Sequence, residues 1–320
     1  MNGHEKASAW LAGTLESAFV AHRRILFELA YRITGTVTDA EDIVQETFAR
    51  ALARPPADRE APLRPWLVRV AANLSRDALR RRRARRYFGP WLPEPLENED
   101  QSAEIPEERP GPEARYSLAE SATFAFLCAL EALTPKERTV LVLRDVMGLE
   151  PDETAEMLST SSGNIRVVHH RARRKLGGYD IERRIPDEAL RERTLHALGA
   201  LLGAIAAGES AKVARLLSED CVLETDAAGE FHAAVVRVVG KDRIAQTEIH
   251  IAAHTAIRSA RFASINGLPG IVFEFEVHHA RRAPRAVFLI DVANDGRIRA
   301  IRSVLATKKV SSFVTTPNRE

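Results

Sequence analysis

Apolar residues recur every three or four positions through two stretches of this chain, residues 8–88 and 114–178. Such spacing predicts amphipathic helices, whose apolar sides meet in the core of an all-α domain. Residues 89–113, between these stretches, are rich in proline and acidic side chains, a composition that favours an extended linker. From residue 180 to residue 310, helical and strand-like periodicities are mixed. We therefore expect a multidomain protein with two all-α domains, a linker and a C-terminal α+β domain.

The C-terminal block combines helices with strands. Residues Ile271–Val277 alternate in part between apolar and polar, as a half-buried strand should. Leu268-Pro269-Gly270 and Asn294-Asp295-Gly296 are the predicted turns, because these residue types tolerate turn conformations. The predicted helices are residues 187–207, 209–218 and 241–253, and the predicted strands are residues 221–225, 257–266, 270–278, 285–292 and 298–305.

The first helical block contains an acidic helix followed by a run of arginines. Thr38 and Glu41 have the spacing of a capping box, in which a threonine caps the helix and a glutamate follows three residues later. The acidic stripe beyond them would ordinarily be a solvated surface. Residues 80–86, however, hold six arginines, and such a local charge is typical of phosphate binding. The combination favours a protein-docking helix beside a nucleic-acid site.

The second helical block has the pattern of a helix-turn-helix. Thr134-Pro135-Lys136-Glu137 combines a capping box with a proline at the first helical position. Gly148 provides a turn, Pro151 opens the next helix, and Ser161 or Ser162 caps the last one. The buried stripe of this last helix is Ile165, Val168, Ala172 and Leu176. Its opposite face is basic, as reading of the major groove requires, although a basic helix with a solvated face is the alternative.

Bulk composition limits the remaining choices. The net charge is only +2, so nucleic-acid binding must come from local clusters. No stretch approaches the roughly 20 apolar residues of a membrane span, and the first residues lack a signal-peptide pattern, so we expect a cytoplasmic protein without membrane contact. Cys128 and Cys221 fit no metal-ligand spacing and should be buried. His169 and His170 diverge on a helix, so no metal or cofactor is expected.

The first block resembles region 2 of the extracytoplasmic-function sigma factors of bacterial RNA polymerase. The resemblance lies in Asp39 through Phe48, in Pro65-Trp66-Leu67 and in Ala71-Ala72-Asn73. It implies that the acidic helix docks on the coiled coil of the β′ subunit, and that the following segment opens the −10 promoter element and binds unpaired bases. The implied polymerase-binding residues are Asp39, Asp42, Gln45 and Glu46. The implied −10 residues are Arg64, Asn73, Arg76, Arg80 and Arg83.

The second block resembles sigma region 4 over Ile165 to Arg174. That resemblance implies contact with the β flap of the polymerase and recognition of the −35 element. Val167 and His169 are unusual in this region, which points to an individual −35 specificity. The implied −35 residues are Ser162, Asn164, Arg166, Val167, His170, Arg171 and Arg174.

The linker from Gly89 to Leu96 and the α+β block resemble the sigma factors that carry a C-terminal SnoaL-like domain. The resemblance implies that this domain replaces a separate anti-sigma protein and acts through contact with the sigma domains and the linker. The implied docking residues are Trp91, Leu92, Pro93, Glu94, Pro95 and Asp226. Two motifs depart from that group. Residues 226–230 carry alanines for two glycines, and residues 306–310 replace an Asn-Pro-Asp-Lys-Leu motif.

Two other functions compete with this interpretation. A ligand-responsive helix-turn-helix regulator that acts without replacing sigma would have no use for the docking helix in residues 38–88. An enzyme with a DNA-binding module would need a catalytic pair in the C-terminal domain, where all four tyrosines are missing. Its candidates are Asp226, His232, Glu248, His250, His254, Glu274, Glu276 and His278. We expect no catalysis, and a small-molecule ligand of this domain remains an open alternative.

Overall fold

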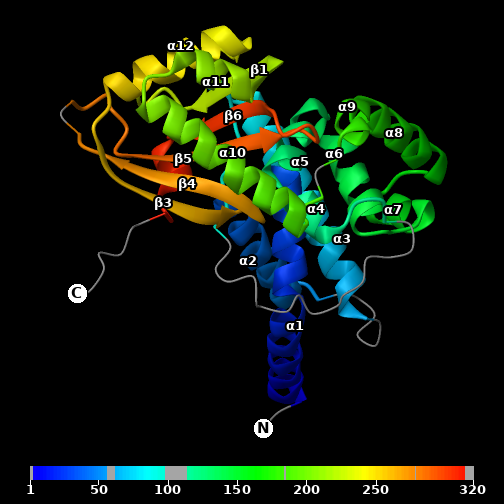
Figure 1. The fold of residues 1–320 in the computed structure, drawn as a ribbon. Helices are drawn as coiled ribbons and strands as arrows, with labels where there is room; N and C mark the ends of the chain where they lie inside the picture. Colours follow the sequence, from blue (N-terminus) through cyan, green and yellow to red (C-terminus); the bar gives the residue numbers. More distant parts are fainter. Residues whose placement is uncertain (1–2, 56–61, 98–113, 184, 278, 314–320) are drawn as a thin grey trace. The chain divides into compact units, whose positions relative to one another are not determined.

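The computed structural model describes residues 3–55, 62–97, 114–183, 185–277 and 279–313 (Figure 1). These residues form two compact units. The first unit takes the described residues up to Arg85, residues 114–122 and Ala129–Gly177, and the second takes the remainder. The acidic residues and prolines of the linker between positions 98 and 113 lie outside the described residues, as does His278.

The first unit begins with three helices, α1 (Gly3–Thr34), α2 (Val37–Ala53) and α3 (Leu63–Ala84). Their apolar sides pack together, and Leu26 and Leu29 of α1 are fully buried, as are Leu67 and Leu79 of α3. Apolar side chains that leave water in this way supply about 25 cal/mol for each Å² buried. The helices expected in residues 8–88 thus correspond to α1, α2 and α3, but the last of them ends at Ala84, and Arg86–Phe88 belong to the second unit.

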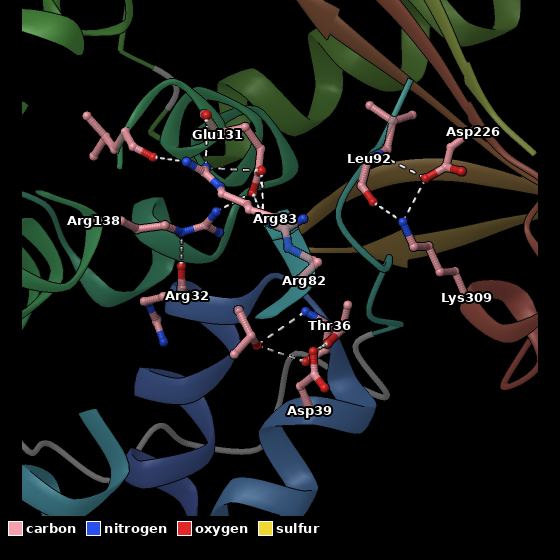
Figure 2. Close-up of polar contacts among 12 residues, drawn as sticks. Arg32, Thr36, Asp39, Arg82, Arg83, Leu92, Glu131, Arg138, Asp226 and Lys309 are labelled. Carbon is pink, nitrogen blue, oxygen red and sulfur yellow. Dashed lines mark hydrogen bonds and ion pairs between the residues drawn. The ribbon is translucent and has the colours of Figure 1, made fainter. Parts of the chain in front are cut away.

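The start of α2 differs from the predicted capping box. The helix begins at Val37, and Thr36 is its N-cap residue, without a side-chain bond to the helix backbone. Thr36 Oγ1 instead donates to Asp39 Oδ2 over 2.7 Å (Figure 2). Thr38 therefore lies inside the first turn, because Gly35, with φ of 81°, ends the inter-helix turn earlier than the Thr–Glu spacing indicated.

Short helices complete the first unit, and their starts match the sequence signals. Thr134 Oγ1 accepts a hydrogen bond from the Glu137 amide at 3.3 Å, and Glu137 Oε2 accepts one from the Thr134 amide at 2.8 Å, which confirms the capping box. Ser161 caps the last helix by accepting from the Asn164 amide. The elements are α4 (Leu118–Ala122), η1 (Leu130–Ala132), α6 (Pro135–Leu141), the π-helical turn η2 (Val142–Val146), α7 (Pro151–Met157) and α8 (Ser162–Lys175).

The second unit is built on a six-stranded sheet with the order β2-β1-β6-β5-β4-β3. Strands β1 and β6 run parallel, and the other neighbours are antiparallel. The strands are β1 (Leu217–Asp226), β2 (Val238–Val239), β3 (Ile257–Ile265), β4 (Leu268–Phe275), β5 (Arg285–Val292) and β6 (Ile298–Val304). Its helices are α5 (Phe124–Ala129), α9 (Gly177–Ile181), α10 (Glu188–Ala206), α11 (Ser210–Leu216), α12 (Lys241–Ala253) and α13 (Thr307–Val310).

Both faces of this sheet are covered. Ile271 and Phe273 of β4 belong to a core that includes Leu198 and Leu201 of α10. Val272, between them, belongs to a second core that includes Leu92 of the linker. Since neighbouring side chains of a strand point to opposite faces, residues 271–273 are all apolar and buried. This explains why their alternation in the sequence is only partial.

The hairpin between β3 and β4 turns two residues earlier than predicted. Asn266 and Gly267 have φ values of 52° and 81°, the conformation that two-residue hairpin turns favour. Leu268-Pro269-Gly270 lies within β4. Pro269 fits there because the pairing of β4 with β5 begins only at Ile271, so no ladder hydrogen bond needs its missing N–H.

Candidate functional site

The acidic side of α2 is a solvent-facing surface. Asp42, Gln45 and Glu46 are exposed, whereas Asp39 is half-buried and bound by Thr36. Ile43, Val44 and Thr47 bury the opposite side of the helix. An open groove runs beside the acidic surface and is lined by Phe19, Arg23, Arg24, Phe27, Glu41, Val44 and Gln45. The helix therefore presents polar side chains beside a groove lined by both apolar and charged residues.

The residues expected at the −10 element lie on α3 but face two directions. Arg64 and Arg80 are exposed, and Arg76 is half-buried and lies 3.7 Å from Asp77. Asn73 Nδ2 instead donates to the backbone carbonyl of Met157, at the end of α7, over 3.2 Å. The first unit thus uses part of the predicted DNA surface for its own packing.

Arg83, the fifth expected −10 residue, belongs to a cluster around Glu131 (Figure 2). Arg82 Nη2 donates to both carboxylate oxygens of Glu131, at 3.0 and 2.8 Å. Arg83 reaches the carboxylate at 3.4 Å and the backbone carbonyl of Leu133. Arg138, which is fully buried, makes the remaining ion pair with Glu131. The arginine run at the end of α3 is therefore held by a carboxylate from the helix-turn-helix half of the unit.

Helix α8 presents the face expected of a DNA-reading helix. Its predicted stripe Ile165, Val168, Ala172 and Leu176 is buried. The side chains of Ser162 and Asn164 are half-buried, and they hydrogen-bond to Asp152 and Thr160. The exposed residues of the opposite face are Arg166, Val167, His170, Arg171 and Arg174.

Asp145, a buried carboxylate that our sequence analysis did not single out, anchors α8. His169 Nε2 lies 2.8 Å from Asp145 Oδ1, and Arg173 Nε donates to Oδ2 at 3.0 Å. Burial would raise the pKa of Asp145, but hydrogen bonds from His169 and Arg173 outweigh it and lower the pKa below its ordinary value. An acid within the apolar run of residues 140–146 was the available signal.

In the second unit, the linker docks on the α+β domain through Asp226. This carboxylate is fully buried, and it accepts hydrogen bonds from the Leu92 amide at 2.8 Å and from the Tyr87 hydroxyl at 2.6 Å. Lys309 Nζ donates to Asp226 Oδ2 at 2.7 Å and also to the Leu92 carbonyl (Figure 2). The Lys309 ammonium lies 4.2 Å from the centre of the Trp91 ring. One ion pair thus fixes both backbone groups of Leu92.

The rest of the expected docking segment is buried as well. Leu92, Pro93, Glu94 and Pro95 are buried, and Trp91 is half-buried. Beyond them the segment continues along the sheet edge, where the Asn266 amide donates to the Leu96 carbonyl at 2.8 Å. Lys309 is the docking residue that our sequence analysis missed. It lies in residues 306–310, which we had noted only as a departure from a related motif.

Three of the acids considered for catalysis lie in different environments, and the rings of His250 and His254 contact each other with their centres 4.3 Å apart. Glu274 pairs with Arg285 at 2.9 Å, and Asp226 pairs with Lys309. Glu248 is buried in α12, which raises its pKa to about 7. Among the described residues, no group of three or more potential ligands could hold a metal ion. No helix in the described part of the chain has the length and apolarity to span a membrane.

Comparisons with known proteins match both helical blocks of the chain. The Sigma-70 region 2 family matches residues 18–85, and the Sigma-70 region 4 family matches residues 123–176. The ECF RNA polymerase sigma factor SigJ of Mycobacterium tuberculosis is 37% identical over 231 residues, which cover 71% of this chain and 70% of SigJ. The probable ECF RNA polymerase sigma factor SigI of the same organism is 32% identical over 261 residues, 80% of each chain. The crystal structure of SigJ is similar with a TM-score of 0.68 and 30% identity, covering 92% of this chain and 98% of SigJ.

The chain therefore belongs to the extracytoplasmic-function sigma factors of RNA polymerase, which act in promoter-specific transcription initiation. Members of this family are regulators rather than enzymes, and they work with core RNA polymerase at promoter DNA. The fold class predicted from the sequence is confirmed as two helical sigma domains followed by an α+β domain. A regulator that acts without replacing sigma is accordingly set aside.

Proposed function

We propose that the acidic surface of α2 binds the β′ coiled coil of core RNA polymerase and that the helix-turn-helix half contacts the β flap. The polymerase-binding residues of this proposal are Asp39, Asp42, Gln45 and Glu46. Exposure of three of these side chains supports it, as does the groove beside them. The proposed domains are residues 8–88 for polymerase and −10 binding, 114–178 for −35 binding, and 180–310 for regulation, with residues 89–113 as the linker.

Promoter recognition is assigned to α3 and α8. At the −10 element the residues are Arg64, Asn73, Arg76, Arg80 and Arg83. At the −35 element they are Ser162, Asn164, Arg166, Val167, His170, Arg171 and Arg174. The basic outer face of α8, rigidly backed by its buried stripe and by Asp145, supports major-groove reading. Half-buried Ser162 and Asn164 would contribute at the N-terminal end of that helix.

Docking of the linker on the C-terminal domain supports regulation in cis, that is, control of the sigma domains by a domain of the same chain. The segment Trp91–Pro95 is largely buried against the C-terminal domain, and the buried ion pair Asp226–Lys309 holds it there. The linker joins the two DNA-reading domains, so a domain that controls the linker controls how freely those domains adapt to polymerase and promoter. This contact takes the place of a separate inhibitory protein.

Run-off transcription with core polymerase tests both parts of the proposal. Asp42→Lys reverses an exposed charge on α2 and should abolish co-purification with core polymerase while the variant stays folded. Lys309→Met should change promoter-dependent output, because it removes the cation of the docking pair. Lys308→Met is the matched control, since Lys308 is the exposed neighbour and carries the same charge. Equal output from the two lysine variants and wild type would contradict regulation through this contact.

A further inference from the structure

The cluster around Glu131 brings three arginines to one carboxylate. The guanidinium groups of Arg82, Arg83 and Arg138 all form ion pairs with Glu131. Arg138 is fully buried and follows Glu131 by seven positions, so this pair stabilises the helix-turn-helix half itself. Arg82 and Arg83 come from the far end of α3, 49 and 48 positions away in the chain.

The charges of the cluster persist at neutral pH. Burial would raise the pKa of Glu131, but the positive charges of Arg138 and Arg82 outweigh it and hold the pKa below its ordinary value. Burial also lowers the pKa of Arg82 to about 10, which leaves its guanidinium protonated. The side chains of Arg82 and Arg83 are 16% and 30% exposed, so the groups lie at the margin of the unit and not in its core.

A carboxylate bound by two guanidinium groups resembles a phosphate in the hydrogen bonds that it accepts. Both anions accept paired N–H bonds from arginine in a planar, bidentate arrangement. Here one nitrogen of Arg82, Nη2, donates to both carboxylate oxygens, and Nη2 of Arg83 reaches one of them. The two arginines also belong to the run of six in residues 80–86, the densest positive segment of the chain.

We propose that Glu131 stands in for a promoter phosphate in the DNA-free protein, and that Arg82 and Arg83 bind the DNA backbone when they leave it. Arg82 becomes a further promoter-binding residue, and Glu131 becomes its internal competitor. The inference rests on the proposed role of α3 in promoter binding. Asn73, which donates to the Met157 carbonyl, is held against the same half of the unit, so DNA binding by this part of α3 competes with several contacts at once.

The test measures binding of the full chain to a forked oligonucleotide of arbitrary sequence, because phosphate contacts do not depend on sequence. Glu131→Gln keeps an oxygen acceptor for buried Arg138 and removes the competing charge. It should bind this DNA several-fold more tightly than wild type. Glu156→Gln, at an exposed position of α7, makes the same change in net charge and should bind like wild type. Equal affinity of both glutamine variants would overturn the inference.

Arg82→Gln gives a second readout that does not depend on Glu131→Gln folding. Loss of one phosphate contact lowers the salt dependence of log affinity by about 0.7 to 0.9, depending on whether the site is single-stranded or duplex. The fold should survive, because Arg83 and Arg138 still hold Glu131. In the double variant Arg82→Gln with Glu131→Gln, the gain in affinity should be smaller than in Glu131→Gln alone, because only Arg83 is then released from Glu131. An unchanged salt slope in folded Arg82→Gln would exclude Arg82 as a phosphate ligand.

Arg80→Ala separates this inference from the role of α3 as a whole. Arg80 is exposed on α3 and outside the Glu131 cluster. If Arg80→Ala weakens DNA binding while the Glu131 and Arg82 variants behave as wild type, α3 binds DNA and Glu131 is only a structural residue. If Arg80→Ala also leaves DNA binding unchanged, the result contradicts the proposed promoter role of α3 itself.

Discussion

The buried pair between Asp226 and Lys309 makes a quantitative prediction about the linker. Lys309→Met preserves the length and apolar stem of the side chain and removes its ammonium group. Asp226 then keeps its hydrogen bonds from Tyr87 and Leu92 but lies in the interior without a cation. We expect the linker segment around Leu92 to open far more often, because opening hydrates that carboxylate.

The size of the effect follows from burial. Asp226 is 0% exposed and the Lys309 side chain 9%, so solvent screens the pair little. Removing one partner of a buried ion pair costs about 3–5 kcal/mol. The cation–π contact with Trp91 adds about 0.5–2 kcal/mol. At about 1.4 kcal/mol for each factor of ten, even the lower figure of ~3 kcal/mol raises the open population about a hundredfold.

Hydrogen exchange at the Leu92 amide measures this opening directly, since that N–H donates to Asp226 Oδ2. Exchange at Leu92 should accelerate by about two powers of ten in Lys309→Met, and stay at the wild-type rate in Lys308→Met. Asp226→Asn combined with Lys309→Met should exchange more slowly than Lys309→Met alone, because no unpaired charge then remains. Wild-type exchange at Leu92 in a folded Lys309→Met protein would refute the reasoning.

Two further predictions concern α8 and α12. Arg171→Ala removes an exposed side chain of α8 and should lower the salt slope of −35 DNA binding by about 1 without changing thermal stability; a change in thermal midpoint with an unchanged slope would contradict a DNA contact. Burial raises the pKa of Glu248 to about 7 in the folded state. The stability that the protonated carboxyl contributes is therefore fully present below the pKa of the unfolded state and is lost as pH rises through 7. Denaturant unfolding should show this as a loss of about 3 kcal/mol between pH 4.5 and pH 7, and Glu248→Gln should remove that pH dependence; an identical pH profile in the variant would show that another group titrates.

Several elements were predictable because their signals are local. The helix expected at 241–253 and the strand expected at 285–292 have the same bounds in the structure. The cap at Thr134 was predicted correctly, and the cap of α8 was predicted at Ser161 or Ser162 and lies at Ser161, since a cap involves residues three positions apart. Where two turn or cap signals lie within a few residues of each other, the prediction chose the wrong one. The turn was predicted at Leu268-Pro269-Gly270 but lies at Asn266-Gly267, and the N-cap was predicted at Thr38 but is Thr36.

The sequence alone determined the helical and strand periodicities, the buried stripe of α8 and the family resemblance, because each depends on residues close together along the chain. Only the tertiary structure decided which charged groups meet. Lys309 lies 83 positions from Asp226, and Arg82 lies 49 positions from Glu131. Lys309 and Arg82 each have sequence neighbours of the same residue type, and no local sequence pattern distinguishes Lys309 from Lys308. Long-range packing chooses between them, because it buries one ammonium beside a carboxylate and leaves the other in water.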